Sequence, residues 1–316
     1  MHLDKVRIKG KLILLFVAIV WGFAFVFQNK TIGYLDAFTV NALRCLIAAV
    51  FLVPVLLIKA KIKKEKVIKE NKAQKKDLLI AGVLCGLFLC LAMNIQQFGM
   101  ILYPSDAAVS GRSGFITALY VVFVPIISLI FKQRLRITVI ISVILATLGM
   151  FLLCFSKGFD KVYIGDLIVL ISALGFALQI IVIDRYSDRV DGIKLSIIEF
   201  LICGFISLIL MFIFEKPSFE NISKVMGPIL YLGIVSSGVG YTLQIIGQQY
   251  SKNPTLDSII MSFEAVFAAI GGHLILSQHL SFIEIIGCLV MLVSIIIGQL
   301  NENPLIYLRK PKQDEK

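Results

Sequence analysis

The residues that could do chemistry in this sequence are a few charged side chains embedded in long apolar stretches. Glu264 lies in the run IIMSFEAVFAAIGG (259–272), whose other members are apolar or small, and Arg44 and Arg112 lie in similar runs. An embedded carboxyl group can take up a proton or hold a substrate ammonium group, and a guanidinium can hold a carboxylate. The structural alternative for Glu264 is a bond to the backbone or to Arg44 on another helix.

The composition around these residues is that of a membrane protein. Of the 316 residues, 58% are hydrophobic and 16% are charged, and the mean hydropathy is +0.92, whereas soluble domains are roughly 45–50% apolar. A hydrocarbon core of about 30 Å needs roughly 20 helical residues to cross it. We therefore predict an all-α membrane protein with ten transmembrane helices, at approximately residues 11–29, 35–58, 78–102, 107–131, 137–156, 165–183, 193–214, 227–250, 254–277 and 281–300.

The basic residues predict how the chain is oriented in the membrane. With the N-terminus in the cytoplasm, most of the 31 Lys and Arg residues fall in segments on the cytoplasmic side, as the positive-inside rule requires. Both termini are then cytoplasmic, and the expected location is the plasma membrane. The lysine-rich segment 59–76 contributes much of the net charge of +11. We interpret it as a topology signal near anionic lipid headgroups, so no nucleic-acid partner is expected.

Three short motifs recur in the same order in the two halves of the sequence. The pairs are GFA at 22–24 and 175–177, NIQQFG at 94–99 with TLQIIG at 242–247, and ALYVVFV at 118–124 with SFEAVFA at 262–268. Because five crossings place the start of a second copy on the opposite side of the membrane, the two copies are inverted, as in many secondary transporters. We predict two inverted five-helix repeats, at 1–157 and 158–300, followed by a cytoplasmic tail at 301–316.

Longer motifs give the chain a family resemblance. They are WGFAF in the first predicted helix, GFITALYVVFVP in the fourth, and PTLDSIIMSFEAVFAAIGGHLILSQHL from the ninth onward. With the ten predicted spans, they resemble the EamA-type transporters of the drug/metabolite transporter superfamily. The family pattern has Glu-Pro and then Leu-Gly-Glu in the ninth helix, whereas this chain keeps Glu264 but has Ala265, and later Ser277 and Gln278. The resemblance implies a central cavity lined by the third, fourth, eighth and ninth helices.

Helical spacing and the resemblance together select the candidate binding residues. Polar residues three or four positions apart share one helix face, and the pairs that do so on these helices are Asn94 with Gln97, Thr117 with Tyr120, and Tyr241 with Gln244. This spacing places Gln96 off the polar face of the third helix. The predicted substrate-binding residues are Trp21, Arg44, Asn94, Gln97, Arg112, Thr117, Tyr120, Tyr241, Gln244 and Glu264. The alternative for each is an interhelical hydrogen bond.

The predicted function is a secondary transporter, an exporter of small polar or amphipathic metabolites such as amino acids, that works by alternating access. Proton coupling is one option, and a homodimer is left open. A lipid flippase or a membrane-embedded ligand sensor is the alternative. The sequence has three histidines and no His-Glu-x-x-His, Gly-x-Ser-x-Gly or Walker-type pattern, so neither an enzyme nor an ATP-driven pump is expected. No cofactor or metal is expected, and the six cysteines are interpreted as apolar packing residues.

Overall fold

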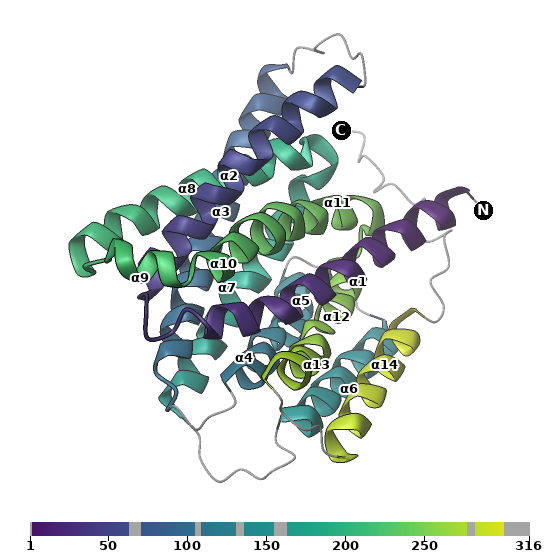
Figure 1. Cartoon of the computed structure of the whole chain (residues 1–316). Helices are drawn as coiled ribbons and strands as arrows, with labels where there is room; N and C mark the ends of the chain where they lie inside the picture. The colour runs from purple at the N-terminus through teal and green to yellow at the C-terminus, as the bar shows by residue number, and fades with distance from the viewer. Residues whose placement is uncertain are drawn as a thin grey trace.

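The computed structural model describes residues 2–62, 71–104, 109–130, 136–154, 163–276 and 282–299, and within these ranges the regular structure is entirely helical (Figure 1). The elements in chain order are α1 (His2–Asn29), α2 (Ala37–Ile62), α3 (Lys72–Ile101), α4 (Val109–Ala118), α5 (Tyr120–Ile130), α6 (Ile137–Cys154), α7 (Ile164–Tyr186), η1 (Ser187–Arg189), α8 (Gly192–Phe214), α9 (Phe219–Lys224), α10 (Met226–Leu230), η2 (Tyr231–Tyr241), α11 (Thr242–Ser251), α12 (Pro254–Met261), α13 (Glu264–Leu276) and α14 (Phe282–Gln299).

Eight helical segments in the described part of the chain are long and apolar enough to cross a membrane. They are Val6–Asn29, Ala37–Ile62, Lys72–Ile101, Val109–Ile130, Ile164–Arg189, Gly192–Phe214, Met226–Ser251 and Pro254–Ile275. The two remaining predicted spans coincide with α6 and α14, which contain the shorter apolar stretches Ile137–Leu152 and Ile285–Gly298. A multi-pass membrane protein is thus confirmed, whereas crossings by α6 and α14 remain a prediction.

Helices that are distant in sequence form the interior of the molecule. α3 packs against α7 and α8, and α1 packs against α11 and α13, while α6 and α14 lie side by side (Figure 1). Small residues permit the closest of these contacts, as is usual between membrane helices. A Cβ atom on Gly22 would lie 2.4 Å from the Cβ atom of Phe267, so α1 and α13 can only approach this closely with glycine there.

Among the described residues, two membrane-spanning segments are interrupted by a turn, one in each half of the chain. α4 and α5 are separated at Leu119, and α12 and α13 at Ser262–Phe263. Both interruptions are 3₁₀-type turns, in which Leu119 N–H donates to Ile116 O (3.2 Å) and Phe263 N–H donates to Ile260 O (3.3 Å). These two positions are matched by the predicted alignment of 118–124 with 262–268. Glu264 and its aligned residue, Tyr120, each begin the second part of an interrupted helix.

Candidate functional site

The membrane-spanning helices surround an internal cavity. Its lining residues come from both halves of the chain, from α1, α2, α3, α4, α5, α7, η2, α11 and α13. The cavity has a volume of about 30 Å³, which is room for roughly two water molecules. The space is smaller than a metabolite, and all the residues that line it are buried.

Seven of the ten predicted binding residues line this cavity. They are Trp21, Arg44, Thr117, Tyr120, Tyr241, Gln244 and Glu264. All seven are buried. Trp21 and Tyr241 form an aromatic wall, because their ring centroids are 4.6 Å apart. The structure thus brings these residues to one site, and their contact with a substrate remains a prediction.

Arg44 is the cavity's cationic group. Only 3% of its surface is exposed, and its Nε and Nη2 atoms donate to the hydroxyl groups of Ser237 and Ser236, both at 3.0 Å. Within the described residues, its guanidinium forms no ion pair with a carboxylate. The hydroxyl groups hold the guanidinium but supply no negative charge to balance it.

Glu264 is the cavity's acidic group. It is 2% exposed, and its Oε1 atom has no hydrogen-bond partner in the part of the chain that the structure describes. The Arg44–Glu264 bond considered as an alternative is not formed. A charged group near the centre of a membrane costs about 2.5–3.5 kcal/mol on insertion scales, so both groups are expensive to keep unless they have a ligand or proton to bind.

Amide side chains missed by the helical-spacing argument complete the cavity. Gln28 Nε2 donates to Gln96 Oε1 (3.1 Å), and Gln96 Nε2 donates to Thr117 Oγ1 (2.8 Å). On another wall, Gln244 Nε2 donates to Gln179 Oε1 (3.1 Å). Gln28, Gln96 and Gln179 all line the cavity. The prediction that Gln96 points away is therefore wrong, and the repeat that matches NIQQFG with TLQIIG, pairing Gln96 with Gln244, is the signal that would have found it.

Two further predicted residues join helices away from the cavity lining. Asn94 accepts from Asn41 Nδ2 (3.1 Å) and donates to Ser207 Oγ (2.9 Å), which ties α3 to α2 and α8. Gln97 Oε1 accepts from Gln28 Nε2 at 3.2 Å, and its Nε2 donates to Thr31 Oγ1 at 3.4 Å. Their observed contacts are the interhelical hydrogen bonds named as the alternative.

Arg112, the last predicted residue, forms an ion pair at one end of the helix bundle. Its Nε and Nη2 atoms each lie 2.6 Å from a different carboxylate oxygen of Asp166. Tyr103 donates its hydroxyl to Asp166 Oδ1 (2.6 Å), Tyr163 donates its backbone N–H to Oδ2 (2.8 Å), and the guanidinium lies 4.8 Å from the Tyr163 ring centroid. Burial, followed by the hydrogen bond to Asp166, raises the pKa of Tyr103, so its hydroxyl remains a donor. We call these four residues the Arg112 cluster.

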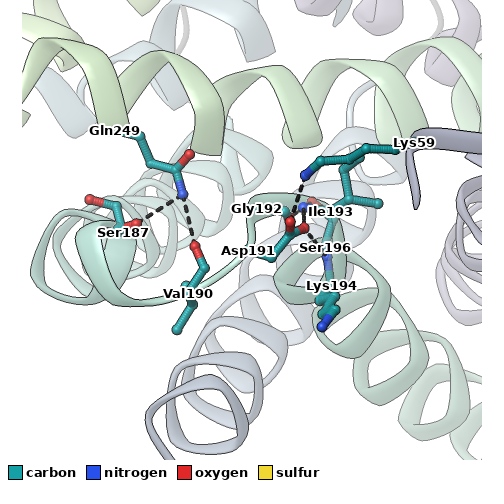
Figure 2. Close-up of polar contacts among 9 residues, drawn as sticks. All are labelled: Lys59, Ser187, Val190, Asp191, Gly192, Ile193, Lys194, Ser196 and Gln249. Atoms are coloured by element: carbon teal, nitrogen blue, oxygen red, sulfur yellow. Dashed lines mark hydrogen bonds and ion pairs between the residues drawn. The ribbon is translucent and has the colours of Figure 1, made fainter. Parts of the chain in front are cut away.

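A second polar cluster lies at the other end of α7, where the chain turns into α8 (Figure 2). Lys59 of α2 lies 2.5 Å from Asp191 Oδ2, and Gln249 of α11 donates to the carbonyl oxygens of Ser187 (2.9 Å) and Val190 (3.2 Å). Burial alone would raise the pKa of Asp191, but the hydrogen bonds from Lys59 and from two backbone N–H groups of α8 hold that pKa below its usual value. This turn is therefore fixed to α2 and α11.

The chain is similar to known proteins over nearly its whole length. Residues 8–155 and 163–298 match the EamA-like transporter family. A protein of Archaeoglobus fulgidus described as an uncharacterized transporter is 28% identical over 295 residues, covering 93% of this chain and 87% of that protein. The uncharacterized transporter YoaV of Bacillus subtilis is 24% identical over 300 residues, covering 92% and 97%. A solved crystal structure shares the fold, with a TM-score of 0.70 at 16% identity over 92% of this chain and 96% of that chain.

Proposed function

The chain belongs to the EamA-like transporter family, and from this membership we propose that it exports small polar or amphipathic metabolites, such as amino acids, by alternating access. We propose further that ten membrane-spanning helices form two inverted five-helix repeats, 1–157 and 158–300, with both termini in the cytoplasm at the plasma membrane. The matched interruptions at Leu119 and Ser262–Phe263 support this arrangement, because transporter sites are often built from broken helices in corresponding positions of two repeats.

One observation supports the substrate class above all others: a buried cation and a buried carboxyl group line the same cavity without pairing with each other. Arg44 is held by hydroxyl groups alone, and one oxygen of Glu264 has no partner within the described residues. A zwitterion supplies a carboxylate for the guanidinium and an ammonium group for the carboxyl. In its absence, a proton can occupy Glu264, which is how proton coupling would arise.

Alternating access requires that the cavity open toward one side of the membrane at a time. In the proposed topology, the Arg112 cluster lies at the outer end of the helix bundle. The cluster joins three helices: Tyr103 follows the end of α3, Arg112 lies in the first turn of α4, and Asp166 lies in the first turn of α7. These three helices also contribute Gln96, Thr117 and Phe176 to the cavity lining. Arg112 and Thr117 are separated by about 7.5 Å along α4. We propose that the Arg112 cluster closes the outer entrance.

The experiment that tests the function is uptake of labelled L-amino acids into proteoliposomes, with and without a pH gradient. Glu264→Gln keeps the size of the side chain but removes its charge and its ability to exchange a proton. We expect uptake to fall by roughly tenfold or more, because the free energy of one hydrogen bond to a charged group corresponds to a change of about that size. Glu220→Gln, on the exposed helix α9, is the matched control and should transport normally.

The outcome decides between the candidate functions. Full proton-dependent uptake by Glu264→Gln would refute the assigned role of this carboxyl group. Movement of a fluorescent phospholipid between leaflets, with no amino-acid uptake by the unmodified protein, would indicate the flippase alternative.

A further inference from the structure

The helix that faces Arg44 has an unusual backbone. η2 (Tyr231–Tyr241) is an 11-residue π-helix inside the membrane-spanning segment Met226–Ser251. π-helical structure is rare, is usually limited to one turn, and is frequent at functional sites. A π-helix is wider than an α-helix, so successive side chains diverge by a smaller angle. This geometry lets two neighbouring residues, Ser236 and Ser237, both reach the guanidinium of Arg44.

Glycines bring this π-helix close to its neighbours. A Cβ atom on Gly233 would lie 2.7 Å from a side-chain carbon of Ile47 on α2, and a Cβ atom on Gly240 would lie 2.8 Å from Trp21 Nε1 on α1. Trp21 also donates its indole N–H to the backbone carbonyl of Ser236 at 3.2 Å. The sequence GIVSSGVG (233–240) therefore holds the serine pair at a fixed distance from both α1 and α2.

The serine pair holds the guanidinium without neutralising it. The two embedded arginines of the described chain show the contrast: Arg112 is bound on two nitrogens by one carboxylate, whereas Arg44 is bound on two nitrogens by two hydroxyl groups. Among the described residues, no acceptor binds the third nitrogen of Arg44, Nη1, although Arg44 lines the cavity. A guanidinium has five N–H donors in a planar fork, so donors remain for a ligand.

We propose that Ser236 and Ser237 are positioning residues that present the guanidinium of Arg44 to an anionic group of the substrate, and that they thereby make the cavity selective for carboxylates over amines. This inference rests on the proposed function, because it assigns the substrate chemistry of the same cavity. A carboxylate entering the cavity receives charge-assisted hydrogen bonds from the guanidinium. An amine that lacks the carboxylate leaves the buried cation unpaired. A carboxylate placed at either serine position would take up the guanidinium itself.

The test compares Ser237→Asp with Ser237→Asn, two side chains of nearly the same size that differ in charge. The purified protein is titrated with L-valine and L-leucine and with isobutylamine and isoamylamine, the corresponding amines without a carboxylate, and thermal stabilisation is measured. We expect the amino acids, but not the amines, to stabilise the unmodified protein and, more weakly, Ser237→Asn, whose neutral amide oxygen can accept from Arg44 in place of the hydroxyl. Ser237→Asp should bind the amino acids at least about tenfold more weakly, because the introduced carboxylate competes for Arg44.

A second variant and a second assay separate the ways in which the proposal can fail. Ser236→Asp should reproduce the loss, which guards against a folding defect confined to Ser237→Asp. Equal binding by the Asp and Asn variants, or no stabilisation of the unmodified protein by either amino acid, overturns the assignment. Uptake into proteoliposomes is measured in parallel: amino-acid binding without uptake would refute the transport function and leave the role of the serine pair standing.

Discussion

Asp166→Asn tests whether the Arg112 cluster closes the outer entrance. The substitution keeps the shape of the side chain but leaves the guanidinium of Arg112 facing a neutral amide. An exposed ion pair contributes about 0–1 kcal/mol, and breaking a buried one costs about 3–5 kcal/mol. The side chains of Arg112 and Asp166 are 15% and 10% exposed, so we place the loss between these limits, at about 2 kcal/mol.

The loss should fall mainly on the closed conformation, because opening the entrance hydrates both groups and makes their pairing unimportant. The equilibrium then shifts toward the outward-open conformation by about 2 kcal/mol, or roughly 30-fold. A cysteine introduced at Thr117, in the cavity lining, reports this shift through its rate of modification by a membrane-impermeant thiol reagent added outside. The same cysteine is used in every variant, and protein that retains Thr117 supplies the background from the native cysteines.

We expect the modification rate in Asp166→Asn to rise toward this 30-fold limit. Asp188→Asn is the control, because Asp188 pairs with Lys252 on the exposed turn at the other end of α7. A rate that is unchanged in Asp166→Asn, or raised equally in Asp188→Asn, would show that the Arg112 cluster does not gate the cavity.

Two further predictions concern stability. Gly22→Ala should destabilise the protein by about 1–3 kcal/mol and so lower its thermal midpoint, because the added Cβ atom would lie 2.4 Å from Phe267 Cβ. Gly227→Ala is the control and should not lower the midpoint, since nothing lies within 4 Å of that position. Equal midpoints for the two variants would show that α1 and α13 can separate freely. Asp191→Asn should destabilise the protein at neutral pH, because the depressed pKa of Asp191 means that its carboxylate stabilises the folded state above its unfolded pKa of about 3.9. That contribution is lost as the pH falls through the lower folded pKa, so unfolding measured between about pH 6 and pH 3 should show the gap between the two proteins closing at the acidic end.

Much of this protein's structure can be predicted from its sequence alone, because lipid strongly constrains which segments can cross a membrane and where charged residues can lie. Apolar blocks of about 20 residues predict membrane-spanning helices, and eight of them have that length and composition in the described chain. The cost of a charge in hydrocarbon predicts that Arg44 and Glu264 avoid lipid, and both line the internal cavity. The motifs repeated in the two halves pair Leu119 with Phe263, and a helix is interrupted at each of these positions.

The partners of these side chains depend on how the helices are packed. Counting 3.6 residues per turn assumes an uninterrupted α-helix of known rotation, so it selected Gln97 although Gln96 faces the cavity. It also gave no indication of a π-helix that directs Ser236 and Ser237 to one guanidinium. Arg44 and Arg112 look alike in the sequence, since each is a single cation in an apolar run. Only the packing of the helices gives Arg112 a carboxylate 54 positions away and gives Arg44 two hydroxyl groups instead.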